Sequence, residues 1–180
     1  MRVIPARLRT LMLKTAGAEI GQSTRILEGG YYYGDLSRLR IGSGVFINVA
    51  VDLFPTGGIH IGNNAAIGPR TLISTAHHST TNADRRGGRQ KFSPVTIGDG
   101  AWLGANVTVL GGVVIGEGAV IAAGSLVTRD CDPHTLYAGT PAKLVKRLDH
   151  SSDRAELTPS LHAVDELQDL PSVQGQRSAR

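Results

Sequence analysis

The sequence predicts an all-β fold in which short strands wind around a prism, and a six-residue repeat is the first observation behind this prediction. From position 97 the chain divides into consecutive six-residue units that begin at Ile97, Leu103, Val109, Ile115, Ile121 and Val127. Amphipathic helices repeat apolar residues every three or four positions and half-buried strands every two, so a period of six fits neither. A short strand followed by a turn fits it, because a glycine often fills the second position and tolerates a crowded corner.

Stacking and composition are the second and third observations. Three units close one triangular coil of eighteen residues, so we expect Ile97 to stack on Ile115, Leu103 on Ile121 and Val109 on Val127. The same phase occurs earlier in the chain, and five or six coils at about 4.8 Å per strand give a prism on the order of 25 Å long. The chain is 41% hydrophobic but only 4% aromatic, which suits a narrow core of small aliphatic side chains.

Length, charge and cysteine content restrict the remaining possibilities. A chain of 180 residues fits a single domain. Its net charge of +4 comes from scattered basic residues, and the scarcity of aromatic residues argues against nucleic-acid binding. Cys131 is the single cysteine, so no internal disulfide can form and a reducing, cytoplasmic setting is expected. We interpret Cys131 as a small buried residue rather than a nucleophile.

The two ends of the chain lie outside the repeat. Residues 1–18 predict an amphipathic helix that caps the prism, with Pro5 at its start and Leu8, Leu11 and Met12 as apolar residues. Flanking basic residues leave contact with a membrane surface as the alternative, although no run is long enough for a signal peptide or a membrane span. The prism is assigned to 19–140, a basic and helical segment to 141–150, and a disordered tail to 151–180, with one short helix from Thr158.

The repeat is interrupted once, directly after the sequence LISTAHHST at 72–80, and it resumes about twenty residues later. The interruption predicts an extended loop over residues 77–94. Inserted loops carry function more often than the scaffold that supports them. The pair His77 and His78 at the start of this loop is therefore the first candidate for chemistry.

The stretch IGDGAWLGANVTVLGGVVIGEGAVIAAGSLVTRDCDPHTLYAGTPAKLVKRL resembles the hexapeptide-repeat acyltransferases, nearest the maltose, galactoside and polysaccharide O-acetyltransferases. The resemblance extends well over residues 40–148 and loosely over 18–40. It implies a left-handed parallel β-helix, a handedness that the repeat alone does not give. It also implies transfer of acetyl from acetyl-CoA to a hydroxyl of a sugar, a polysaccharide precursor or another small compound, without a metal. The implied assembly is a homotrimer with active sites between subunits.

In the resembled family, the histidine before the inserted loop is the general base that takes a proton from the acceptor hydroxyl. A positioned base of this kind typically contributes about a hundred- to ten-thousand-fold. The family's pattern of Thr, two residues and then the base places this role on His78, because Thr75 is followed by Ala76 and His77. His77 is then interpreted as a corner or solvent-facing neighbour. Ser79 stands where the sugar acetyltransferases usually have proline.

The resemblance also implies positions for the donor. Trp102 and Ala105 match the positions that hold the thioester, where a backbone N–H near Ala105 would stabilise the oxyanion. The remaining matches are to the pantetheine arm and to the phosphates of the donor, whose negative charge favours cations; they are Ala123, Thr128, Arg129, Lys143 and Lys146. For each lysine, the alternative is a solvated residue on a terminal helix.

For the acceptor, Asn48 matches the asparagine that orients the sugar in the maltose and galactoside enzymes. The alternative is an asparagine stacked in a corner of the prism. The acidic residue that those enzymes use a few positions later aligns with Pro55, and their N-terminal helical domain is replaced by a short basic segment. These two departures argue against maltose or galactoside as the acceptor.

Two other functions remain open on the same scaffold, because a fold does not by itself specify an activity. The γ-class carbonic anhydrases share the prism and need three separated histidines. His60, His77 and His78 are available, but two adjacent histidines do not supply separated ligands, which argues against zinc. The other function is that of a catalytically silent assembly protein. A metal assay and a measurement of acetyl-CoA binding distinguish these possibilities.

Overall fold

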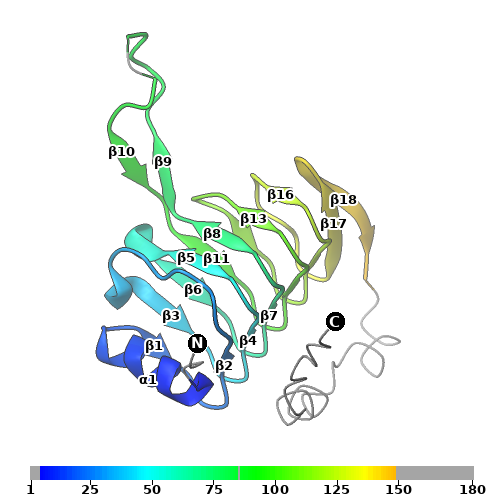
Figure 1. Ribbon diagram of the computed structural model, residues 1–180. Helices are drawn as coiled ribbons and strands as arrows, with labels where there is room; N and C mark the ends of the chain where they lie inside the picture. Colours follow the sequence, from blue (N-terminus) through cyan, green and yellow to red (C-terminus); the bar gives the residue numbers. More distant parts are fainter. Residues whose placement is uncertain (1–4, 85, 149–180) are drawn as a thin grey trace, which may run out of the picture. The chain divides into compact units, whose positions relative to one another are not determined.

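The computed structural model describes residues 5–84 and 86–148. The described residues fall within one compact unit, 1–148, and the second unit, 149–180, is not described. The expected disordered tail at 151–180 and its short helix therefore lie outside the described residues. Figure 1 shows short strands stacked in successive coils, with one hairpin that projects from them.

Three parallel sheets form the faces of the prism, and each coil contributes one strand to each face. Sheet A contains β1 (Glu19–Ile20), β3 (Leu39–Ile41), β6 (Ile59–Ile61), β11 (Val95–Ile97) and β14 (Val114–Ile115). Sheet B contains β2 (Arg25–Ile26), β4 (Phe46–Ile47), β7 (Ala66–Ile67), β12 (Trp102–Leu103), β15 (Val120–Ile121), β17 (Thr135–Gly139) and β18 (Ala142–Arg147). Sheet C contains β5 (Asp52–Phe54), β8 (Leu72–Ser74), β13 (Thr108–Val109) and β16 (Leu126–Val127). The chain runs from A to B to C in each coil, and the predicted left-handed parallel β-helix is confirmed.

The stacking that the repeat predicts is confirmed in the strand registers. Ile97 pairs with Ile115, Leu103 with Ile121 and Val109 with Val127. All six of these side chains are buried. A second internal row, four residues into each unit, is buried as well and consists of Ala101, Val107, Val113, Ala119 and Ser125. The core is thus a set of aliphatic columns that run along the prism axis.

The corner glycines are required by the close approach of neighbouring coils. A Cβ atom on Gly98 would lie 2.5 Å from the backbone nitrogen of Glu117, a distance that real Cβ atoms do not reach. At two of the described corners the left-handed backbone position is taken by asparagine instead, Asn64 and Asn106, each with φ of 55°. Asparagine tolerates this region better than most residues do.

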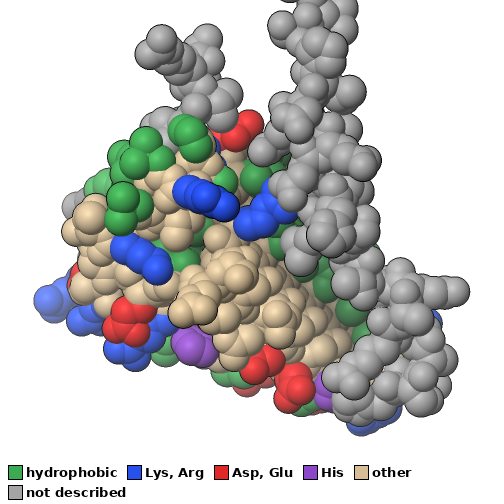
Figure 2. Space-filling model, turned by 90° about the horizontal axis from the view of Figure 1, so that it is seen from below, with side chains coloured by type: hydrophobic (Ala, Val, Ile, Leu, Met, Phe, Trp, Pro, Cys, Tyr) green, Lys and Arg blue, Asp and Glu red, His purple; other side chains and the backbone are tan. Residues whose placement is uncertain are grey.

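Helix α1 (Ala6–Thr15) packs against the first coil, and Pro5 precedes it. Leu13 is its buried residue, and the Arg9 guanidinium donates to the Ile26 carbonyl and lies 3.6 Å from the Glu28 carboxylate. The apolar residues expected to face the prism, Leu8, Leu11 and Met12, are instead about half exposed, because Arg9 and Leu13 form the contacting face. Figure 2 shows hydrophobic side chains gathered over this helix. Within the described part of the chain, no helix is long and apolar enough to cross a membrane.

The extended loop expected after the histidine pair is present, and β9 (Ala76–His78) pairs with β10 (Gln90–Phe92) at its base to form a β-hairpin. One further segment differs from the expected structure. The basic segment expected to be helical forms strand β18, which pairs antiparallel with β17. Gly139, with φ of 103°, reverses the chain there, and β18 satisfies the open edge of β17. The described corners also contain two short 3₁₀ helices, η1 (Leu36–Arg38) and η2 (Pro55–Gly57).

Candidate active site

The hairpin β9–β10 stands at the corner between sheet C and sheet A, because β8 precedes it and β11 follows it (Figure 1). Thr75 fixes its base. The buried Thr75 hydroxyl donates to the Phe54 carbonyl at 2.7 Å and accepts the Gly57 N–H at 2.9 Å. The Thr75 carbonyl in turn accepts the Ser93 N–H at 2.9 Å. Thr75 therefore ties the hairpin to the preceding coil and joins its two ends to each other.

His78 lies at the end of β9, opposite Gln90, and its side chain is exposed. Its Nδ1 lies 3.0 Å from the Gly88 carbonyl oxygen. A carbonyl can only accept, so the hydrogen of the neutral imidazole is on Nδ1, and Nε2 keeps its lone pair. His78 thus has the tautomer that a general base requires.

His77 differs from His78 in both direction and contacts. Successive side chains of a strand point to opposite faces, so His77 lies on the other face of the hairpin, opposite Lys91. Within residues 5–84 and 86–148, no hydrogen bond fixes its imidazole. The expected solvent-facing position of His77 agrees with this geometry.

The positions assigned to the donor and the acceptor divide between two corners. Ala105, Ala123 and Asn48 follow strands of sheet B and lie where the chain turns toward sheet C. Thr128 and Arg129 follow β16 and lie at the same corner as the hairpin. Trp102 is 44% exposed on β12, and Lys143 and Lys146 are exposed on strand β18 rather than on a helix. A single chain therefore does not bring His78 together with all of these residues.

The hydrogen bonding of two of these corner residues bears on the site. The Asn48 side-chain oxygen accepts the Val49 N–H at 2.7 Å, so within the chain Asn48 stabilises its own turn. The Ala105 N–H has no hydrogen-bond acceptor among the residues that the structure describes. It is consequently available to a negatively charged oxygen of a ligand.

The middle of the outward face of sheet B is apolar, a feature that the sequence analysis missed. One row of side chains crosses this face in register, with Arg25 and Lys146 at its two ends; between them lie Phe46, Ala66, Trp102, Val120 and Leu136. The equivalent row of sheet A is polar or charged over four strands, at Glu19, Arg40, His60 and Thr96, and ends in the exposed Val114. Within the regular repeat this row recurs once per coil, as at Trp102 and Val120, which are eighteen positions apart. The sequence does not show whether water or protein covers such an outward-pointing residue.

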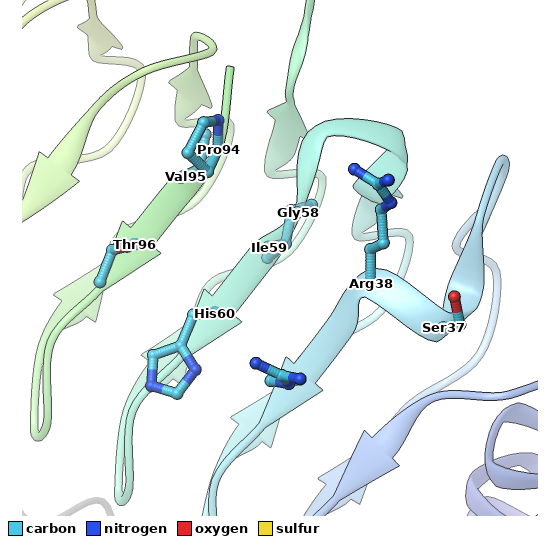
Figure 3. A pocket seen from close by; sticks show the side chains of 9 residues that line it. Ser37, Arg38, Gly58, Ile59, His60, Pro94, Val95 and Thr96 are labelled. Carbon is cyan, nitrogen blue, oxygen red and sulfur yellow. The ribbon is translucent and has the colours of Figure 1, made fainter. Parts of the chain in front are cut away.

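A groove of about 360 Å³ lies on sheet A (Figure 3). Arg38 lies beside Gly58 at the corner, and His60 points outward from the neighbouring strand. The arginines of the groove are already paired: Arg38 lies 3.2 Å from Asp35, and Arg40 lies 3.2 Å from Glu19. None of the residues that the sequence assigns to the site lines this groove.

A second pocket, of about 280 Å³, lies at the base of the hairpin. Its walls include the rings of Tyr33, Phe54 and Phe92, and its polar groups belong to Thr56, Ser74 and Gln90. The sequence analysis missed this pocket. The run of three tyrosines at 31–33 was a signal, but only the fold brings it next to residues 54 and 92.

The histidines needed for a metal site do not come together. His60 lies on β6 in sheet A, whereas His77 and His78 lie on the hairpin. Among the described residues, no group of three or more His, Cys, Asp or Glu side chains is placed to hold a metal ion. This geometry gives the carbonic anhydrase alternative no support.

Residues 94–129 match the family model of the bacterial transferase hexapeptide repeat. The galactoside O-acetyltransferase of Escherichia coli K12 is 30% identical over 140 residues, which cover 78% of this chain and 68% of that protein. The chain belongs to the hexapeptide-repeat acetyltransferases. The galactoside O-acetyltransferase of Lactococcus lactis is 37% identical over 142 residues, 79% of this chain and 68% of that protein. The predicted family is confirmed.

Solved structures of hexapeptide-repeat acetyltransferases support the same family assignment. A hexapeptide-repeat acetyltransferase of Vibrio cholerae in complex with acetyl-CoA superposes with a TM-score of 0.75 at 31% identity, over 82% of this chain and 80% of that one. A galactoside acetyltransferase in complex with coenzyme A superposes with a TM-score of 0.74 at 30% identity, over 82% of this chain and 72% of that one.

Proposed function

We propose that His78 is the general base of this acetyltransferase. The predicted O-acetyltransferase activity and the predicted donor, acetyl-CoA, are confirmed by the galactoside O-acetyltransferase relatives and by the neighbours bound to acetyl-CoA or coenzyme A. The observation that carries the assignment of the base is the contact between His78 Nδ1 and the Gly88 carbonyl. This contact orients the ring and leaves Nε2 free to take a proton.

The proposed reaction is a direct transfer. The acceptor hydroxyl oxygen attacks the thioester carbon while Nε2 of His78 takes the hydroxyl proton. The carbonyl oxygen gains negative charge, which the Ala105 N–H stabilises. The C–S bond then breaks, the sulfur of coenzyme A receives the proton from the imidazolium, and the products are an acetyl ester and free coenzyme A. The base ends the cycle in its starting state.

The donor residues are proposals from the family resemblance, and their positions are compatible with a long ligand. Trp102 and Ala123 are exposed on sheet B and at its corner, where they would contact the thioester end and the pantetheine arm. Lys143, Lys146 and Arg129 are exposed cations, which suit the phosphates of the donor. Thr128 is exposed beside Arg129 and supplies a hydroxyl donor.

We infer that the enzyme is a homotrimer with its active sites between subunits. The described residues place His78 at one corner of the prism, whereas Ala105, Ala123 and Asn48 lie at another. A second copy would supply the missing half of each site, with Asn48 on the acceptor. The apolar row on sheet B, which includes Trp102, supports this inference because buried interfaces favour aromatic and aliphatic side chains.

The test of the base compares two neighbouring histidines. His78→Ala should lower kcat by about two to four orders of magnitude and leave the KM for acetyl-CoA within a few-fold, because the proton acceptor is lost and the donor surface is intact. His77→Ala is the matched control and should change kcat little. Release of the coenzyme A thiol at saturating acceptor measures both. Equal losses would mean that the histidines act as a unit, and a larger loss at His77 would move the base to that residue.

A further inference from the structure

We propose that helix α1 docks on a membrane surface that carries anionic phospholipids. The exposed apolar side chains of the helix enter the lipid layer and its exposed cations contact the headgroups; they are Leu8, Leu11 and Met12, and Arg7 and Lys14. This inference goes beyond the proposed function, because it concerns where the enzyme is held and not which group it transfers. Three observations carry it: the direction of the apolar side chains, the contacts that fix the helix, and the sign of its charge.

The apolar side chains of α1 lie on the side that faces away from the prism. Leu13 is the buried residue of the helix, and Leu8 and Leu11 lie roughly 140–160° around the helix axis from it. Leu8, Leu11 and Met12 are 47%, 56% and 51% exposed. Because they are three and four positions apart, these side chains are neighbours on the helix surface. A row of large apolar side chains left in water is unfavourable and indicates a binding face.

Contacts on the inner side of α1 fix this orientation. The Arg9 guanidinium donates to the Ile26 carbonyl and lies 3.6 Å from the Glu28 carboxylate. At the other end of the helix, the Leu13 carbonyl accepts the Ala18 N–H at 3.0 Å, which ties the helix to the segment that leads into β1. Turning α1 to bury its outer leucines would break these contacts. The apolar face therefore stays uncovered within residues 5–84 and 86–148.

The charge of α1 is entirely positive. The first acidic residue of the sequence is Glu19, so the helix contains no carboxylate. Arg7 and Lys14 are exposed, and they lie on one side of the helix beside Leu11, because they are seven positions apart. Neither cation forms an ion pair within the part of the chain that the structure describes. Figure 2 shows basic and hydrophobic side chains next to each other on the face that carries α1.

An anionic lipid surface complements this face, whereas a second copy of the helix does not. Two copies of α1 packed through their leucines would bring Arg7 beside Arg7 in a parallel pair, or beside Lys14 in an antiparallel pair, with no carboxylate on either helix. A lipid surface offers acyl chains to the leucines and phosphates to the cations, whose long stems reach back to the headgroups. Amphipathic helices with basic residues beside an apolar face are typical of this contact.

The proposed trimer strengthens a contact that one short helix makes only weakly. Helix α1 has 10 residues, so a single copy contributes little apolar surface. A three-fold axis places three copies of α1 at the same level along it, so all three can meet one surface. Once one helix is bound, the others bind from a high effective concentration. We therefore expect a reversible contact that weakens as ionic strength rises.

The experiment measures binding of the full chain to vesicles by co-sedimentation. The vesicles contain phosphatidylcholine alone or an equal mixture of phosphatidylcholine and phosphatidylglycerol. The wild-type protein should bind the anionic vesicles at least about tenfold more tightly than the neutral ones at low salt, and high salt should release it. Two double variants, Leu8→Gln with Leu11→Gln and Arg7→Gln with Lys14→Gln, should each weaken binding to the anionic vesicles about tenfold or more.

Matched controls change exposed residues of the same kinds elsewhere on the prism. Arg70→Gln with Arg89→Gln removes the same charge from a corner and from the hairpin, and Leu110→Gln with Val114→Gln removes apolar side chains that are 40% and 46% exposed. Both controls should bind anionic vesicles within about threefold of wild type, because α1 is intact. Sedimentation velocity without lipid checks that every variant keeps the oligomeric state of the wild type.

Four results would overturn the proposal. Failure of the wild-type protein to bind anionic vesicles at low salt would leave a protein as the occupant of this face. Equal losses in the two charge variants would mean that the vesicles attract the net charge of the protein rather than α1. Unchanged binding by the leucine variant would mean that no apolar side chain enters the lipid. A changed oligomeric state of the leucine variant would mean that another copy of the chain covers the face.

Discussion

Cys131 shows at the scale of one residue how the prism controls reactivity. It is 4% exposed, and burial, together with the negative charges of Asp130 and Asp132, raises the pKa of its thiol to about 11. The thiol is therefore protonated at neutral pH, and only the thiolate is a good nucleophile. We expect iodoacetamide to alkylate the native protein at least about tenfold more slowly than the urea-unfolded protein, as measured by intact mass. Fast alkylation of the native protein would show that Cys131 is accessible.

Single residues also show what the sequence could and could not predict about the site. The pattern around Thr75 selects His78 over His77, and the two side chains do lie on opposite faces of a strand. The group that sets the tautomer of His78 is the Gly88 carbonyl, ten residues away across the hairpin. A backbone carbonyl carries no sequence signal, so this contact could only be found in the structure. The donor and acceptor positions stay predictions.

At the scale of elements, the hairpin depends on one hydroxyl. Thr75→Val keeps the shape of the side chain but leaves the Gly57 N–H without its partner and removes the bond to the Phe54 carbonyl. Loss of hydrogen bonds to buried groups costs about 1–3 kcal/mol. We expect thermal or urea unfolding to show a loss of this size, and kcat to fall because the base of the hairpin loosens. Thr75→Ser keeps the hydroxyl and should restore most of both; a Val variant as stable and active as wild type would contradict this role.

The aliphatic columns give a second prediction for elements. Leu103 is fully buried and stacks between Ile67 and Ile121. Leu103→Ala should lower the free energy of unfolding by about 2–5 kcal/mol, because it removes apolar contacts and leaves a cavity. Val114→Ala is the control on a neighbouring sheet, where the side chain is 46% exposed, and should stay within about 0.5 kcal/mol of wild type. Urea denaturation measures the free energy of unfolding of both variants. Similar losses in the two would contradict the stabilising role of the aliphatic columns.

The strands outside the repeat were not predicted, for a shared physical reason. The short strands β9 and β10 at the base of the expected loop were not foreseen, and β18 (Ala142–Arg147) forms where a helix was expected. Outside the repeat, no period identifies a strand, and β9, β10 and β18 contain mostly exposed residues. Their structure comes from pairing with another strand. Such pairing is a tertiary effect that local propensity does not predict.

At the scale of the whole molecule, the repeat predicts the buried side chains of the prism better than the side chains on its outer faces. Each coil contacts mainly its neighbours, so the period alone predicts the stacking of Ile97 on Ile115 and of Leu103 on Ile121. Outward positions follow no such rule. The apolar row that contains Phe46 and Trp102 on sheet B contrasts with Arg40 and His60 on sheet A only once strands are assigned to faces. This contrast supports an assembly, which a mixing experiment tests directly.

The mixing experiment uses two inactive variants with complementary defects. His78→Ala removes the base, and the double variant Lys143→Glu, Lys146→Glu weakens binding of acetyl-CoA through exposed side chains. If each site takes His78 from one subunit and its donor surface from the next, every mixed trimer has one intact site. Equal amounts of the two variants, unfolded and refolded together, should then regain about a quarter of wild-type activity at subsaturating acetyl-CoA. The reason is that about three quarters of random trimers are mixed, and each mixed trimer has one intact site out of three.

The control mixes the same two variants as folded trimers, which should recover nothing because the subunits have not exchanged. Wild-type protein taken through the same refolding sets the full scale. Sites built within one chain give no intact site in any mixture, so activity no higher than the sum of the two variants would refute the shared site. Recovery upon mixing the folded proteins would mean that subunits exchange freely. Sedimentation of the refolded mixture then shows whether the active species is the trimer that the apolar face of sheet B supports.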